Sequence, residues 1–193
     1  HDLRTPLTGI IGNSSSYLKM ENELSDRDKH EIVENIKSDA GWLLNMVENL
    51  LSVTRINNET AKVNKSMESV DEVISSAVDR FKKRFPDAQL RVFPSDDVIM
   101  IMMDPLLIEQ VISNILQNAQ VHANSTKPLE LRVSEENDKV WFCIRDYGVG
   151  IDEDKIETIF DGVGYREDRQ TTADGYKGMG IGLSICKTIV TAH

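Results

Sequence analysis

Apolar residues in the first third of the chain recur at intervals typical of α-helices. In the first 20 residues the steps are four, three, four and three, through Leu3, Leu7, Ile10, Ser14 and Tyr17, of which only Ser14 is not apolar. Between residues 33 and 54 they alternate strictly between three and four, at Val33, Ile36, Ala40, Leu43, Val47, Leu50 and Thr54. Such spacing places one apolar stripe along each helix. Ser25, followed three residues later by Asp28, predicts a capping box at the start of the second helix.

A single helical hairpin cannot bury the apolar surface of both stripes. Two hairpins from two copies of the chain would form a four-helix bundle that buries both stripes. We therefore predict that residues 1–57 form a helical hairpin and a homodimer. Packing of the stripes onto the remainder of the same chain is the alternative.

The sequence pattern changes after residues 58–66, which are polar and predicted to be a linker. Helices are expected at 71–85, 105–123 and 180–192, and strands at 90–93, 98–103, 129–136 and 139–146. Asp104 is the expected N-cap of the second of these helices, with Pro105 in its first turn. This mixture predicts an α/β sandwich over residues 67–193, with a mixed sheet and helices on one face.

Composition limits the partners and the compartment. With 32 acidic and 22 basic side chains the net charge is −10, which disfavours nucleic acid and anionic lipid as direct partners. Cys143 and Cys186 form neither a metal motif nor a disulfide framework, so we expect two small buried thiols in a reducing, cytoplasmic setting. The sequence has neither a signal peptide nor an apolar run of the ~20 residues that a membrane helix needs. We expect a fragment of a longer protein that meets the membrane only through other parts of the parent chain.

The first residues of the chain carry reactive groups. On a helical wheel His1 and Thr5 lie one turn apart on the side opposite the apolar stripe, with Asp2 beside them. A carboxylate can orient one ring nitrogen of an imidazole and leave the other as a nucleophile. Pro6 lacks the N–H that a helix interior uses, so we expect a soft point beside the histidine.

Three segments of the second region could contact a nucleotide. Asn114 and Asn118 lie one turn apart on the predicted helix 105–123, and their amide oxygens would suit Mg²⁺. Asp146 follows a strand and could accept a hydrogen bond from an adenine amino group, within the segment Asp146-Tyr147-Gly148-Val149-Gly150-Ile151. Backbone N–H groups before the last helix could surround phosphates, in the segment Gly178-Met179-Gly180-Ile181-Gly182-Leu183.

Taken together, these motifs resemble those of the two-component sensor histidine kinases. The opening His1-Asp2-Leu3-Arg4-Thr5-Pro6-Leu7 resembles the H box of that family, and the three later segments resemble the N, G1 and G2 boxes of the Bergerat-type ATP-binding fold, in the same order. Ile159-Phe160-Asp161 resembles the F box. The resemblance implies ATP-dependent autophosphorylation of His1 and transfer of the phosphoryl group to an aspartate of a response-regulator receiver domain. It implies that Asp2 acts as base or orienter and that Thr5 supports dephosphorylation of the partner.

The resemblance also assigns roles in the nucleotide pocket. Asn118 would be the Mg²⁺ ligand, Asn114 a phosphate-side contact, Asp146 the adenine acceptor and His122 the ring stacked on adenine. Residues 161–177, with Arg166 and Arg169, would form the mobile lid, and the terminal strand of the domain would be missing. The closest resemblance is to the osmosensitive potassium-transport sensors, whose parent chains are anchored in bacterial membranes. The full expected binding set is Asn114, Asn118, His122, Asp146, Gly148, Gly150, Ile151, Lys177, Gly178, Gly180, Gly182 and Leu183.

One motif departs from the family pattern. The N box is usually Asn-Ala-x-Lys-Tyr, whereas this chain has Val121 and His122 in the last two places. Loss of a lysine beside developing phosphate charge would weaken stabilisation of the transition state, and Lys177 could substitute for it. The alternative interpretation is a nucleotide-binding docking module with weak kinase activity that acts mainly as a response-regulator phosphatase. An unrelated ATPase of the same fold is a third interpretation, although such proteins lack the heptad hairpin headed by His-Asp.

Overall fold

The computed structural model describes residues 3–56, 63–160 and 182–193, which fall into two compact units divided between Leu51 and Ser52. The N-terminal unit is a hairpin of helix α1 (Arg4–Met20) and helix α2 (Asp26–Ile56). The capping box is confirmed. The Ser25 hydroxyl accepts from the Asp28 N–H at 3.2 Å, while the Asp28 carboxylate accepts from the Ser25 N–H at 3.3 Å.

The two helices of the hairpin approach closely at Gly9. A Cβ atom at Gly9 would collide with the carboxylate of Asp39, so the glycine leaves the space in which that side chain lies. This close approach places residue 9 of α1 level with residue 39 of α2.

The predicted apolar stripe of α2 divides between two environments. Ile36 and Leu43 are half-buried, whereas Val33, Val47 and Leu50 remain exposed. The single heptad stripe expected from the sequence is therefore not buried as a unit within one hairpin. Part of the apolar stripe remains in contact with solvent.

Pro6 lies in the first turn of α1 as described, since the helix begins at Arg4. The first four N–H groups of any helix have no intrahelical acceptor, so the missing N–H of Pro6 breaks no hydrogen bond among the described residues. His1 and Asp2, on the other side of the expected soft point, lie outside those residues.

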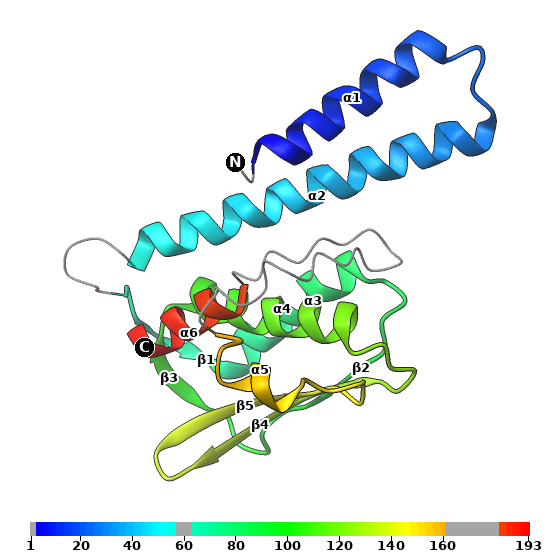
Figure 1. Ribbon diagram of the computed structural model, residues 1–193. Helices are drawn as coiled ribbons and strands as arrows, with labels where there is room; N and C mark the ends of the chain where they lie inside the picture. Colours follow the sequence, from blue (N-terminus) through cyan, green and yellow to red (C-terminus); the bar gives the residue numbers. More distant parts are fainter. Residues whose placement is uncertain (1–2, 57–62, 161–181) are drawn as a thin grey trace. The chain divides into compact units, whose positions relative to one another are not determined.

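The C-terminal unit is built on a mixed sheet, as predicted. Strand β2 (Leu90–Phe93) pairs in parallel with β4 (Leu129–Glu136), which pairs antiparallel with β5 (Lys139–Arg145). Helices α3 (Val70–Arg84), α4 (Pro105–His122) and α6 (Gly182–Ala192) lie on one side of this sheet (Figure 1).

Two short features were not predicted. Strand β1 (Ser66–Ser69) pairs antiparallel with β3 (Met100–Met103) and makes a separate two-stranded sheet. Helix α5 (Glu153–Ile156) is a single turn.

A tight turn joins β4 to β5 where the sequence places Asn137 and Asp138. Both residues have positive φ, 53° and 58°, and the pairing resumes directly from Glu136 to Lys139. Asn and Asp tolerate this left-handed conformation better than most residues, which makes them suitable for a two-residue hairpin turn.

The main core lies between the sheet and helices α3 and α4. A second buried cluster joins α4 to α6. The fully buried side chains of the main core include Val70, Ala77, Met103, Ile112, Leu116 and Leu131.

None of the helices in the described ranges is long and apolar enough to span a membrane.

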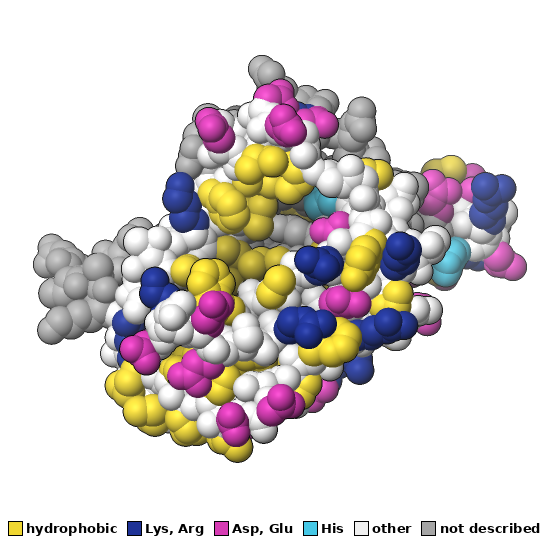
Figure 2. Space-filling model, turned by 90° about the horizontal axis from the view of Figure 1, so that it is seen from below, with side chains coloured by type: hydrophobic (Ala, Val, Ile, Leu, Met, Phe, Trp, Pro, Cys, Tyr) yellow, Lys and Arg dark blue, Asp and Glu magenta, His cyan; other side chains and the backbone are white. Residues whose placement is uncertain are grey.

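The outer face of the sheet shows that one expectation was wrong. Cys186 is buried as expected, but Cys143 is exposed, because alternate residues of β5 point away from the helices. Trp141, two residues earlier, is exposed by 55% on the same face. Figure 2 views this side of the molecule, where apolar, basic and acidic side chains are intermixed.

Candidate nucleotide-binding site

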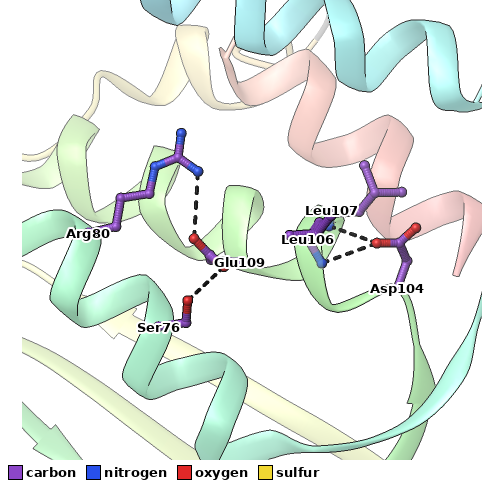
Figure 3. A network of polar contacts seen from close by, with 6 residues as sticks. All are labelled: Ser76, Arg80, Asp104, Leu106, Leu107 and Glu109. Atoms are coloured by element: carbon purple, nitrogen blue, oxygen red, sulfur yellow. Dashed lines mark hydrogen bonds and ion pairs between the residues drawn. The ribbon is translucent and has the colours of Figure 1, made fainter.

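Helix α4 carries three of the predicted site residues, and its start is fixed by its cap. Asp104 accepts hydrogen bonds from the N–H groups of Leu106 and Leu107, at 3.1 and 3.2 Å (Figure 3). Pro105 occupies the first helical position, where an N–H is not needed. The predicted cap is therefore confirmed.

A polar contact fastens α4 to α3. The Glu109 carboxylate accepts a hydrogen bond from the Ser76 hydroxyl at 2.8 Å and faces the Arg80 guanidinium at 3.6 Å (Figure 3). The Glu109 side chain is only 15% exposed, so this contact is partly shielded from water. It restrains the helix that presents Asn114 and Asn118.

The end of α4 is joined directly to the Asp146–Ile151 segment. Asn124 ends the helix in the left-handed conformation, with φ of 49°. The carbonyl of Ala123 then accepts a hydrogen bond from the Val149 N–H at 3.0 Å. Gly148 lies so close that a Cβ atom there would come within 3.0 Å of three backbone atoms of Ala123. The first glycine of the motif is thus required for contact between two backbone segments.

The Asp146 side chain organises the turn that follows it. Its carboxylate accepts from the Gly148 N–H at 2.9 Å, and the side chain is exposed. Gly150 has a φ of +75°, and a Cβ atom added there would meet no other atom within 4 Å, so backbone conformation rather than crowding favours glycine. Ile151, the last residue of the motif, is also exposed.

Asn114, Asn118 and His122 follow one another at four-residue intervals along one side of α4. The two asparagines are half-buried, and His122 lies at the last turn of the helix. His122 is exposed overall, but partial desolvation of its imidazole lowers its pKa below the usual value of 6.5. The ring is therefore mainly uncharged at neutral pH, which suits stacking on a base.

Helix α6 packs against the middle of α4 through a buried cluster. Within it, the Asn114 side-chain amide lies 3.9 Å from the Cys186 sulfur, which in turn lies 3.9 Å from the Val111 carbonyl oxygen. Burial raises the pKa of the Cys186 thiol to about 11. The other members of the cluster are Leu107, Ile185 and Ile189.

His193 joins the other ends of these two helices. Its ring accepts from the Asp104 N–H at 3.1 Å through Nε2 and lies 2.8 Å from the Ile189 carbonyl oxygen through Nδ1. Because the backbone N–H can only donate, these contacts require the proton on Nδ1. Lys65 donates to the carbonyl oxygen of His193 at 2.6 Å.

The structure thus brings together Asn114, Asn118 and His122 on α4 and connects the end of α4 to the motif that starts at Asp146. Gly182 and Leu183 form the start of α6. Thr5 is exposed in the first turn of α1, in the N-terminal unit. The remaining predicted site residues, and the predicted lid with its arginines, lie outside the described residues: His1, Asp2, Lys177, Gly178 and Gly180.

Three residues that support the site were not identified from sequence patterns. Ala123 contributes only backbone atoms. Lys127 lies with its ammonium 5.2 Å from the centre of the Tyr147 ring, which joins two loops distant in sequence. Cys186 was expected in the core, but its contact with Asn114 depends on how α6 packs on α4.

Comparison with known families agrees with this arrangement. Residues 1–59 match the His Kinase A (phospho-acceptor) domain, and residues 103–193 match the family described as histidine kinase-, DNA gyrase B-, and HSP90-like ATPase. The chain belongs to the two-component sensor histidine kinases.

Individual relatives show the same relationship. The chain is 41% identical over 193 residues to sensor protein KdpD of Clostridium acetobutylicum, covering all of this chain and 21% of that protein. The chain thus spans about a fifth of the length of that relative. Among solved structures, Acinetobacter baumannii histidine kinase AdeS aligns with a TM-score of 0.65 at 19% identity, over 100% of this chain and 86% of that one. Histidine kinase ThkA in complex with response regulator protein TrrA aligns with a TM-score of 0.59 at 18% identity, over 83% of this chain and 47% of that one. These two structures share the fold.

Proposed function

We propose that the chain is the catalytic core of a sensor histidine kinase that transfers the γ-phosphoryl group of ATP to His1. The phosphoryl group would then pass to an aspartate of a response-regulator receiver domain. The junction between α4 and the Asp146 motif carries the proposal. There the Val149–Ala123 hydrogen bond and the glycine contact bind the predicted base-recognition turn to the helix that presents the asparagines.

Each described residue has a role in this proposal. The exposed Asp146 carboxylate would accept a hydrogen bond from the adenine amino group. The hydrogen bond that it already accepts from the Gly148 N–H would hold it in place for this contact. The neutral ring of His122 would stack on the base. Asn114 would contact the phosphates, and the glycines before α6 would supply N–H donors.

The α4 asparagines also fit a magnesium ion carried by the nucleotide. Asn118 is half-buried and lies one turn from Asn114, and an amide oxygen is a hard ligand of the type that Mg²⁺ accepts beside phosphate oxygens. We propose Asn118 as the ligand. When bound, the ion would neutralise phosphate charge.

The proposal for the phosphoacceptor rests on the N-terminal motif. A ring nitrogen of His1 would attack the γ-phosphorus in line, with Asp2 orienting the imidazole or receiving its proton. Thr5, exposed in the first turn of α1, would help position a water molecule when the partner is dephosphorylated.

The direct test uses γ-labelled ATP with Mg²⁺ and compares the wild type with His1→Gln. Phosphohistidine is labile in acid and stable in alkali, so the expected label has both properties in the wild type and is absent from the variant. Acid-stable label, or equal label on both proteins, would contradict the assignment of His1.

Val121 favours the alternative that the chain is a nucleotide-binding docking module and phosphatase with weak kinase activity. It is half-buried on α4, where the family pattern has a lysine, and it brings no positive charge to the phosphates. A protein that binds ATP but does not label itself, and that speeds dephosphorylation of a receiver domain, would be a docking module and phosphatase. Restored labelling in Val121→Lys would assign the defect to this position.

We also propose that the N-terminal hairpin forms a homodimer. On α1, Leu3, Leu7, Ile11 and Leu18 fall within roughly 80° of the helix surface and are 44–75% exposed. On α2 a comparable exposed stripe borders the half-buried residues Ile36 and Leu43, and it consists of Val33, Leu44, Val47 and Leu51. A second hairpin would cover both stripes in a four-helix bundle.

The stimulus belongs to other parts of the parent protein. Similarity to sensor protein KdpD supports the osmosensitive potassium-transport type proposed from the sequence. We propose that the chain works on the cytoplasmic side of a bacterial membrane, because ATP and response regulators are found there. The ThkA–TrrA complex supports a response regulator as the partner.

A further inference from the structure

Cys186 is placed where it can act on a residue of the nucleotide site. It lies in the first half of α6, four residues after the helix begins at Gly182, and its sulfur faces α4. Only 2% of the residue is exposed. Its neighbour on α4 is Asn114, which we have proposed as a phosphate-side contact.

The sulfur has a donor on one side and an acceptor on the other. The Asn114 amide nitrogen approaches it at 3.9 Å as donor, while the thiol donates to the Val111 carbonyl at 3.9 Å. A thiol can do both only while it keeps its proton. Since burial raises its pKa to about 11, the proton stays in place throughout the physiological range.

This contact contributes to the orientation of the Asn114 side chain. An asparagine amide has a nitrogen end and an oxygen end that differ in hydrogen bonding but hardly in shape. A sulfur that accepts from the nitrogen end selects one of the two orientations. Apolar neighbours from the rest of the cluster would not distinguish them.

We propose that Cys186 is a positioning residue for nucleotide binding, which acts by orienting the Asn114 amide and by coupling the start of α6 to α4. This inference rests on the proposed function of Asn114. Displacement of α6, which follows the glycine-rich segment, would change the orientation of Asn114 through the same contact.

The test compares Cys186→Ala with Cys186→Ser in the 193-residue chain. Both substitutions remove the bulk of the sulfur, but only serine keeps a donor and an acceptor. We expect the alanine variant to bind ATP·Mg²⁺ about threefold more weakly than the wild type and the serine variant to stay close to it, given the weak hydrogen bonds of sulfur. In an Asn114→Ala background the alanine substitution should have little further effect.

A second readout does not depend on ATP. The side-chain amide resonances of Asn114, recorded by NMR without nucleotide, should move in Cys186→Ala and much less in Cys186→Ser. Equal binding losses in the two variants, an undiminished loss in the Asn114→Ala background, or unmoved amide resonances would overturn the proposal. If the wild type fails to bind ATP, the proposed function is wrong, and the NMR comparison still decides whether Cys186 orients Asn114.

Discussion

Replacement of Gly148 by alanine tests whether the junction between α4 and the Asp146 motif holds the nucleotide site together. The added Cβ would come within 3.0 Å of three backbone atoms of Ala123, and backbone atoms cannot rotate away as a flexible side chain could. The turn must therefore move away from the end of α4. This displacement would break the 3.0 Å hydrogen bond from Val149 to Ala123.

The expected magnitude follows from these two changes. Loss of one backbone hydrogen bond costs about 1 kcal/mol, and overpacking at a tight contact typically costs about 1–3 kcal/mol. The free energy of unfolding of the C-terminal unit should fall by about 2–4 kcal/mol. For a unit of this size that lowers the melting temperature by roughly 8–15 °C.

Thermal unfolding and ATP titration together make the assay. Gly150→Ala is the matched control, because its φ of +75° is unfavourable for alanine but no atom lies within 4 Å of the added carbon. We expect that control to cost about 1 kcal/mol. The reasoning would be refuted if Gly148→Ala melted and bound ATP like Gly150→Ala.

Three further predictions concern the hairpin, the α3–α4 contact and the base-stacking residue. Leu44→Glu places charge in the exposed stripe and should convert the dimer to a monomer in light scattering, whereas Leu44→Met should not; a dimer in both would argue against this interface. Glu109→Ala removes both contacts to α3 and should lower the free energy of unfolding by about 1–2 kcal/mol, against at most about 0.5 kcal/mol for the exposed ion-pair residue Glu34→Ala. The lowered pKa of His122 means that the unfolded chain binds its proton more readily than the folded chain. The free energy of unfolding should therefore fall as the pH drops through about 6.5, and His122→Gln should reduce this dependence in melting curves; an identical pH profile would contradict the assignment.

Features encoded by neighbouring residues were the ones that could be predicted well from the sequence. The Ser25–Asp28 capping box and the Asp104 cap are made by side chains that bond to backbone groups two or three residues away. The two-residue turn at Asn137 and Asp138 follows from residues that accept positive φ. In each case the local chemistry is sufficient to specify the structure.

Features that depend on distant contacts were missed or wrong. Strand β1 has only four residues, and its pairing with β3 depends on a segment more than 30 residues away. Cys143 looked like a core residue by its type, but the side of the sheet covered by helices decides its exposure. Part of the α2 stripe stays exposed because burial depends on how α2 packs against α1, which the spacing of apolar residues does not specify.

The candidate site shows the same division. The motifs were sufficient to propose Asn114, Asn118, Asp146 and Gly148 as site residues, since each motif is short and contiguous. The contact that requires Gly148 comes from backbone atoms of another motif, and the contact of Asn114 with Cys186 comes from helix packing. No local pattern carries either one.

The hydrogen bonds around His193 have a mechanical consequence. Lys65, immediately before β1, donates to His193 at the end of α6, and the His193 ring accepts from the backbone N–H of Asp104, the N-cap of α4. A displacement of the chain at Lys65 would therefore be transmitted to α6 and, through His193, to α4. Asn114 lies ten residues along a stiff helix from Asp104, or about 15 Å at 1.5 Å per residue. A displacement at Lys65 would therefore reach Asn114, on the phosphate side of the proposed site, through the first three turns of α4.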